Sequence, residues 1–200
     1  SDIANRRISC VGDYTERMQA SAPGKPVFMV LQGFGWGDLR DVSPEFKRVG
    51  RRPTYDETRF MAYDAIVHGA KGLLYWGTAY IDKPSEFWTS LKRVVSELHE
   101  IQHVLAAPVD RAAIQVALDP TSDSVDKSVV VLAKRANDKL CLIVVNEFPA
   151  PQRCTISGIP VPDGTTLRDN LTKRTVPVTD GQINCALSGY GVAVLLEGTQ

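Results

Sequence analysis

The sequence has little of what marks a nucleic-acid-binding or membrane protein. Its Lys+Arg and Asp+Glu counts are both 23 in 200 residues, which gives a formal net charge of zero. Nucleic acids and anionic membranes are bound through basic surfaces, so this balance argues against either as the main partner. No apolar run approaches the roughly 18 residues that a membrane-spanning helix requires. We therefore predict a soluble protein. The sequence leaves its location open, a secreted or periplasmic one included.

The residue spacings of a metal site are also missing. The four cysteines show no CxxC spacing and the three histidines form no ligand cluster with them, so we predict neither a metal nor another cofactor. We interpret the cysteines as small hydrophobic residues, three of them in strands. A disulfide between Cys141 and Cys154, on neighbouring strands, stays open as an alternative. The seven residues are Cys10, Cys141, Cys154, Cys185, His68, His99 and His103.

The most informative stretch is residues 51–76, which predicts one helix followed by one buried strand. Thr54 and Glu57 have the spacing of a capping box, in which each side chain bonds the other residue's backbone N–H. Apolar residues then recur at helical spacing until Gly69, where we expect the helix to end. Residues 70–76 are short and apolar, as in a parallel strand that is covered on both faces. A helix leading into such a strand is the repeating unit of an α/β barrel.

Two more helices are predicted in the first half of the chain. Residues 9–22 and residues 85–105 both place apolar side chains at helical spacing. The apolar face of the first helix carries Val11, Tyr14 and Met18. The side of the second helix that we expect to face solvent carries Lys92, Arg93, Glu97 and Glu100.

Residues 27–32 predict a second buried strand, and residues 33–52 predict a long polar loop after it. A shorter loop follows Trp76 and runs to Lys83. In an α/β barrel, loops at the carboxyl ends of the strands hold the substrate contacts.

From Arg111 the hydrophobic pattern changes to a period of two, which predicts strands. Eight short runs separated by turn residues are typical of an antiparallel β-sandwich. Asp180-Gly181 is a strong hairpin signal, and Asn137-Asp138 lies between two other runs. The predicted strands are residues 112–118, 128–135, 140–146, 152–157, 166–170, 175–178, 182–185 and 191–196. We place a linker at residues 106–110, between an α/β domain at 1–107 and an all-β domain at 108–200.

Part of the sequence resembles a known group of enzymes. PTYDETRFMAYDAIVHGAKGLLYW, residues 53–76, looks like the last helix–strand step of clan A-type glycoside hydrolases, in particular β-galactosidase-like enzymes. KPVFMVLQGFGW, residues 25–36, is similar to their seventh strand and its loop. Residues 127–149 and 189–198 resemble the accessory sandwich that follows such barrels. The resemblance implies the last two βα units of a (β/α)8 TIM barrel followed by a C-terminal antiparallel β-sandwich.

Two βα units are too few for a closed barrel, which needs eight. We expect the other strands to come from the N-terminal barrel portion of the same protein, of which this chain is a piece. The resemblance places a catalytic Glu after the fourth barrel strand and a nucleophilic Glu after the seventh. The fourth strand is not in this sequence, and Gln32 ends the seventh. An amide cannot attack an anomeric carbon, so we leave the catalytic residues unassigned.

Five residues near the two strand ends are candidate substrate contacts. Trp76 ends one strand and offers a flat apolar face to a sugar, while Gln32 ends the other and can hydrogen-bond a hydroxyl. Trp36, Asp38 and Tyr80 follow in the loops. Three of them have a structural alternative: a polar layer inside the barrel for Gln32, a core position for Trp76, and solvation or capping for Asp38.

Two functions of different class remain. The first is the C-terminal part of a carbohydrate-active glycoside hydrolase, with its catalytic carboxylates mainly outside this chain. The second is a non-catalytic carbohydrate-binding or scaffold protein on a degenerate barrel, which Gln32 favours slightly. Carbohydrate is the predicted partner in both. The sequence does not specify the sugar, the linkage or the stereochemical outcome.

Overall fold

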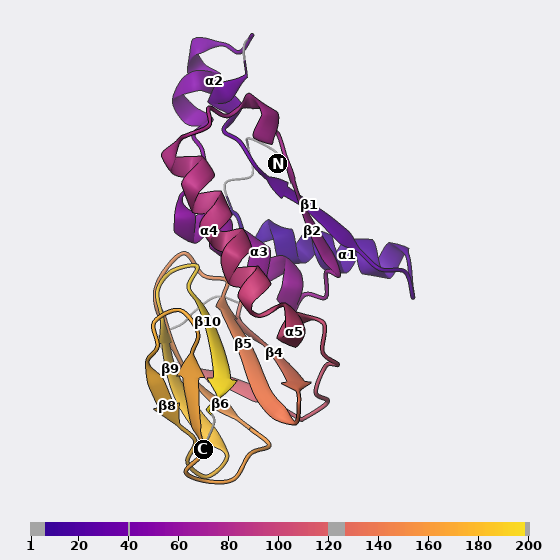
Figure 1. Cartoon of the computed structure of the whole chain (residues 1–200), viewed down its shortest axis with the longest axis vertical. Coiled ribbons are helices and arrows are strands. Elements are labelled where there is room, and N and C mark those ends of the chain that lie inside the picture. Colours follow the sequence, from indigo (N-terminus) through magenta and orange to yellow (C-terminus); the bar gives the residue numbers. More distant parts are fainter. Residues whose placement is uncertain (1–6, 40, 120–126, 199–200) are drawn as a thin grey trace. The chain divides into compact units, whose positions relative to one another are not determined.

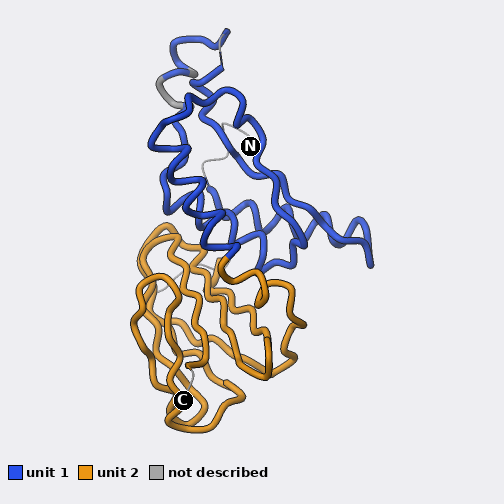
Figure 2. Tube along the Cα trace, in the orientation of Figure 1, with its two compact units in different colours: residues 1–99 blue, residues 100–200 orange. Residues whose placement is uncertain are grey.

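The computed structural model describes residues 7–39, 41–119 and 127–198. The chain divides into two compact units, Ser1–His99 and Glu100–Gln200, which are coloured separately in Figure 2 and described separately below. The predicted domain boundary at residues 107 and 108 falls inside the second unit and stays a prediction. Among the described residues, no helix has both the length and the apolar character needed to cross a membrane.

The first unit contains helices around a two-stranded sheet (Figure 1). Its two predicted strands and the helices predicted at 9–22 and 54–69 are found, but the helix predicted over 85–105 is interrupted at Ile101 and forms two helices, Glu86–Glu100 and Gln102–Leu105. The predicted loop at 33–52, however, contains a 3-10 turn and a short helix that the sequence pattern did not indicate. In chain order the elements are α1 (Cys10–Ser21), β1 (Phe28–Gln32), η1 (Trp36–Asp38), α2 (Pro44–Val49), α3 (Tyr55–Val67), β2 (Gly72–Trp76), η2 (Thr78–Tyr80) and α4 (Glu86–Glu100).

The start and end of α3 follow the local sequence signals. The Glu57 N–H donates to Thr54 Oγ1 at 3.2 Å and the Thr54 N–H donates to Glu57 Oε2 at 2.9 Å, which confirms the capping box. Gly69, just past the helix, has φ of +96°, a left-handed conformation that suits glycine. The helix is buried on all sides rather than on the one predicted face, because every residue from 58 to 65 is buried.

Strands β1 and β2 pair in parallel, with Phe28 opposite Gly72 and Gln32 opposite Trp76. Cover on both faces was predicted for a complete barrel and stays a prediction, since in this chain one face of the pair is open. One face of the pair carries four side chains that are each more than half exposed, because nothing among the described residues covers it: Phe28, Val30, Leu74 and Trp76. On the other face Leu31 is buried, and α3 packs along β1.

Glu97 does not face solvent as predicted. Its carboxylate accepts hydrogen bonds from Arg59 at 2.7–3.1 Å and from the Tyr63 hydroxyl at 2.9 Å, and both charged side chains of the ion pair are 6% exposed. Burial lowers the pKa of Arg59, but hydrogen bonds and the charge of Glu97 outweigh it, so the net pKa is raised and the guanidinium stays charged. The buried pair joins α3 to α4.

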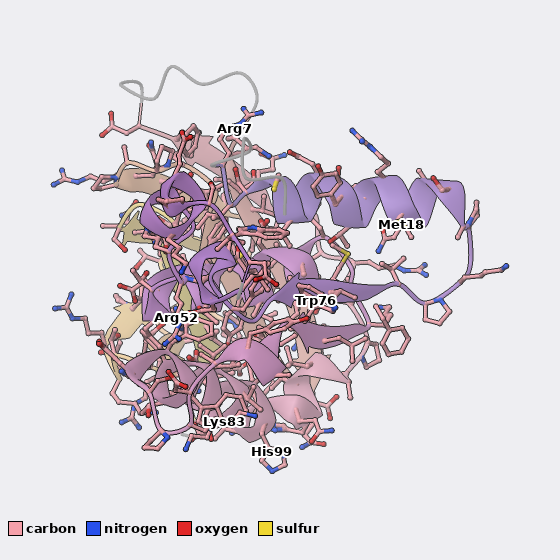
Figure 3. All side chains as sticks on the ribbon, turned by 90° about the horizontal axis from the view of Figure 1, so that it is seen from above. Arg7, Met18, Arg52, Trp76, Lys83 and His99 are labelled. Carbon is pink, nitrogen blue, oxygen red and sulfur yellow. The ribbon has the colours of Figure 1, made fainter. Side chains whose placement is uncertain are left out.

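The predicted apolar face of α1 is also not the buried one. Tyr14 and Met18, the latter labelled in Figure 3, are 43% and 54% exposed. Gly12 and Thr15 are buried instead, and the Gly12 N–H donates to Asp64 Oδ2 of α3 at 2.7 Å. A Cβ atom on residue 12 would come within 2.5 Å of the His68 ring. Close packing of α1 on α3 therefore selects a glycine, which an apolar pattern does not reveal.

The second unit is a β-sandwich with the eight predicted strands. They form a five-stranded sheet in the order β4-β5-β10-β7-β8 and a three-stranded sheet in the order β3-β6-β9, with buried apolar side chains of both sheets forming one core. The elements are α5 (Gln102–Leu105), β3 (Gln115–Leu118), β4 (Val129–Ala136), β5 (Lys139–Asn146), β6 (Gln152–Ser157), β7 (Thr166–Asp169), β8 (Thr175–Pro177), β9 (Gln182–Leu187) and β10 (Val192–Glu197).

Specific residues stabilise the turn between β4 and β5 and the end of α5. Asn137 and Asp138 have φ of +50° and +63°, as a two-residue hairpin turn between β4 and β5 requires. The Lys134 ammonium is buried and donates to the carbonyls of Leu105 and Ala107, both at 2.7 Å. It thereby satisfies carbonyls at the end of α5.

All four cysteines lie in the described residues and none forms a disulfide. The Cys141–Cys154 alternative has no support, because both thiols are free and β5 and β6 are not neighbouring strands. The residue opposite Cys154 is Cys185 of β9.

Candidate functional site

The carboxyl ends of β1 and β2 lie side by side and bring the candidate residues together. Gln32 and Trp76 are the last paired residues of their strands. Directly after them, the Gly33 N–H donates to the Trp76 carbonyl at 2.9 Å. A Cβ atom on residue 33 would lie 2.7 Å from that carbonyl oxygen, so the approach of the two chains requires glycine.

Four rings form an aromatic cluster at this edge of the sheet: Phe34, Trp36, Trp76 and Tyr80. Phe34 is its centre, with ring centroids 5.0 Å from Trp36, 5.0 Å from Trp76 and 6.2 Å from Tyr80. The first two contacts are edge-to-face, an arrangement that aromatic quadrupoles favour. Trp76 and Tyr80 also contact each other, at 5.9 Å.

The cluster has a buried base and an exposed rim. Phe34 is 3% exposed, whereas Trp76 is 51% exposed and Tyr80 is 49% exposed. Trp76 is labelled in Figure 3. An exposed indole that makes an edge-to-face contact with a buried ring offers a flat apolar surface. Such a surface can pack against the C–H face of a sugar ring.

Gly77 allows the chain to turn directly beside this base. Its φ is +85°, and a Cβ atom at this position would lie 2.5 Å from the Phe34 ring. The left-handed turn leads into η2 and so brings Tyr80 against Trp76. The sequence Trp-Gly after a strand therefore has a specific geometric role.

Gln32 positions the loop that carries Phe34. Its Nε2 donates to the Phe34 carbonyl at 2.8 Å. The amide thus does what a carboxylate could not, because a carboxylate has no hydrogen to donate. This contact accounts physically for Gln at a strand end where the family resemblance implies Glu.

Asp38 has a structural position in the same loop. Its Oδ2 accepts from the Gly35 N–H at 2.7 Å, and both its oxygens accept from Arg52 Nε at 2.9–3.0 Å. Burial raises the pKa of Asp38, but the hydrogen bonds from Arg52 and Gly35 outweigh it and bring the pKa below its ordinary value. These contacts favour a role in shaping the loop over direct contact with a substrate.

Sequence reasoning named five of the residues that meet here but missed two others. Phe34 was not predicted as a site residue. Its role depends on contacts with rings from three other segments, and those contacts are known only from the fold. Arg52 lies fourteen positions after Asp38, and only the fold of the loop pairs them. A lone apolar residue between two glycines, as in GFG, was the available signal for Phe34.

The whole chain has the fold of part of several known enzymes. An α-amylase from Geobacillus thermoleovorans, complexed with acarbose, matches with a TM-score of 0.60 and 13% identity over 95% of this chain and 42% of that chain. AmyP in complex with maltose matches with a TM-score of 0.58 and 13% identity, over 95% of this chain and 48% of that chain. The maltogenic α-amylase AmyB of Thermotoga neapolitana has a TM-score of 0.56 and 12% identity, over 94% and 45%.

These likenesses establish the fold. The chain pairs a helical unit containing parallel strands with a β-sandwich, as amylase-like glycoside hydrolase structures do. It spans less than half the length of each of these three proteins. No protein-family model and no curated protein matches the sequence. The β-galactosidase-like family named by the sequence resemblance stays a prediction.

Proposed function

We propose that this chain is the C-terminal part of a carbohydrate-active glycoside hydrolase, and that its aromatic cluster forms part of the sugar-binding floor. The observation that carries the proposal is Trp76, half exposed at a strand end and held on edge by buried Phe34. The fold likeness to enzymes whose structures hold acarbose or maltose supports a carbohydrate ligand.

The exposed apolar face of the β1–β2 pair supports a larger barrel around it. Phe28, Val30 and Leu74 are each more than half exposed on one face of two parallel strands. Parallel sheets are stable when both faces are covered, and an open apolar face of this kind marks an interaction surface. We assign the cover of these three side chains to the N-terminal barrel portion of the same protein, whereas Trp76, at the carboxyl end of the same face, stays open to the sugar site.

The chemistry then divides between this chain and that portion. Hydrolysis of a glycosidic bond uses two carboxylates, about 5–5.5 Å apart in retaining enzymes and about 6.5–9.5 Å apart in inverting ones. In the loop after β1, the carboxylate of Asp38 forms an ion pair with Arg52. This chain therefore contributes binding and positioning, and the general acid and the nucleophile or base come from elsewhere in the barrel.

The second candidate function is carbohydrate binding without hydrolysis of the glycosidic bond. Gln32 replaces the carboxylate that the family resemblance implies, and its amide is used to hold the loop. A degenerate barrel with this substitution would bind carbohydrate without cleaving it.

One experiment separates the two. The full-length protein containing residues 1–200 is incubated with maltotriose and a panel of other neutral oligosaccharides, and new reducing ends and binding heats are measured separately. Cleavage of any member supports the hydrolase, and binding without cleavage supports the second function. Neither binding nor cleavage across the panel would contradict both.

A further inference from the structure

Two cysteines of the sandwich face each other across paired strands. Cys154 of β6 lies directly opposite Cys185 of β9 in an antiparallel ladder. Directly opposed residues in such a ladder have Cα atoms about 4.5 or 5.5 Å apart, depending on their hydrogen-bonding type. Both separations lie within the range of about 4.4–6.8 Å that a disulfide spans.

We propose that Cys154 and Cys185 are a dithiol–disulfide site, which a small disulfide oxidant such as oxidised glutathione converts to an intrachain cross-link. Neither cysteine was paired with the other by the sequence pattern, and neither belongs to the aromatic cluster.

The register of β6 and β9 holds the two sulfur atoms on the same side. The next pair along, Thr155 and Asn184, is joined by a hydrogen bond of 3.0 Å from Thr155 Oγ1 to Asn184 Oδ1. Beyond it, Ile156 and Ile183 are opposite each other and fully buried in the core. A slip of one residue would move these isoleucines to the solvent face, so the cysteines stay opposed.

The two thiols already interact and one of them is accessible. Interaction between the two thiols lowers the pKa of Cys154 and raises that of Cys185. Cys154 is 5% exposed, whereas Cys185 is partly exposed on β9, an edge strand of the three-stranded sheet. Cys141 provides the contrast, because its burial raises the pKa of its thiol to about 12.

The reaction is thiol–disulfide exchange. One cysteine thiolate attacks a sulfur of the oxidant, breaking its S–S bond and releasing one small thiol. The second cysteine thiolate then attacks the mixed disulfide, forms the Cys154–Cys185 bond and releases the other small thiol. The two cysteines lose two electrons and two protons, and the two released thiols gain them.

The Cys154–Cys185 disulfide would link β6 to β9 covalently and close a loop that contains β7 and β8. Constraining a loop of about 30 residues in the unfolded chain raises the melting temperature of a 100-residue unit by on the order of 10 °C.

The test treats the full chain with mixtures of reduced and oxidised glutathione, followed by peptide mapping without reduction. A matched control is the double variant Cys10→Ser with Cys141→Ser, which keeps only the proposed pair. We expect a loss of two hydrogen atoms in mass, a linked peptide pair containing Cys154 and Cys185, and the same link in the control. The oxidised chain should melt higher, and Cys185→Ser should show no such rise.

Three results would overturn the proposal. They are two unlinked cysteines at full oxidant strength, links to Cys10 or Cys141 instead, or a melting temperature that is unchanged or lower once the link has formed. Because the mapping is done on the unsubstituted chain, a variant that fails to fold does not affect the outcome.

Discussion

Gln32 and Trp76 face each other as the last paired residues of two parallel strands, and each holds a different part of one aromatic cluster. Gln32 fixes the Phe34 backbone through a hydrogen bond of 2.8 Å, and Trp76 packs its ring against the Phe34 ring. The strand ends therefore position Phe34 twice, once through its carbonyl and once through its side chain. Trp76 itself is half exposed.

Under the proposed hydrolase function, Gln32→Ala should lower turnover in the full-length protein. The variant removes the donor to the Phe34 carbonyl, so the loop and the rings it carries lose their fixed position. We expect a loss of about tenfold in kcat/KM, which corresponds to one hydrogen bond of about 1.4 kcal/mol. Wild-type kinetics in this variant would show that turnover does not depend on the hydrogen bond from Gln32 to the Phe34 carbonyl.

Glu97→Ala should be strongly destabilising, because it leaves the buried Arg59 charge without its partner. Breaking a buried ion pair costs about 3–5 kcal/mol, and urea unfolding of the chain measures the change. The exposed Glu100→Ala on the same helix is the matched control, with an expected change within about 0.5 kcal/mol. Equal effects of the two variants would mean that the Arg59–Glu97 pair does not join the helices.

Removing the hydroxyl group should lower the stability of the fold at one buried tyrosine but not at another. Among the described residues, the buried Tyr75 hydroxyl has no hydrogen-bond partner, and burial raises its pKa to about 12. Tyr75→Phe should therefore leave stability unchanged or raise it by about 1 kcal/mol. Tyr63→Phe should lower stability by about 1.5–3 kcal/mol, because the Tyr63 hydroxyl donates to the Glu97 carboxylate at 2.9 Å. A clear loss in Tyr75→Phe would show that its hydroxyl has a partner.

The loop after β1 should weaken in acid through Asp38. The pKa of this carboxyl in the folded chain lies below its ordinary value of 3.8, so its contribution is fully present above 3.8 and is lost as the pH falls through the lowered value. Limited proteolysis of the loop at decreasing pH measures this. Asp38→Asn should be cleaved faster at neutral pH and should lose the acid dependence that the wild type shows. If Asp38→Asn keeps the acid dependence of the wild type, the loss of protection in acid comes from other carboxyl groups.

Local signals predicted most elements of the fold. The capping box at Thr54 and Glu57 and the turn at Asn137-Asp138 depend on residues a few positions apart, and both were found in place. Glu97 was placed wrongly because its partner Arg59 lies on another helix, and helical periodicity says nothing about it. Tyr14 was misplaced for a related reason, since packing against α3 selects the small Gly12.

The sequence predicted where the candidate site lies but not how its side chains contact one another. Strand ends identified Gln32 and Trp76 because parallel strands bring their carboxyl ends together. The role of Phe34 and the Asp38–Arg52 pair depend on how a loop folds back, and no short-range pattern encodes that. Likewise, Cys154 and Cys185 are opposed because β6 and β9 are neighbours in the sheet although two strands separate them in the sequence.

The most direct measurement of the central claim is calorimetric binding of maltotriose, and of the other oligosaccharides in the panel, to the full-length protein and to its Trp76→Ala variant. The matched control is Trp88→Ala, since Trp88 lies on α4 beside Lys83, outside the aromatic cluster. We expect Trp76→Ala to weaken binding by about tenfold or more, as loss of an aromatic anchor does, with its melting temperature nearly unchanged. The control should bind as the wild type does. Equal dissociation constants for wild type and Trp76→Ala would contradict the account and remove the aromatic cluster from the sugar site.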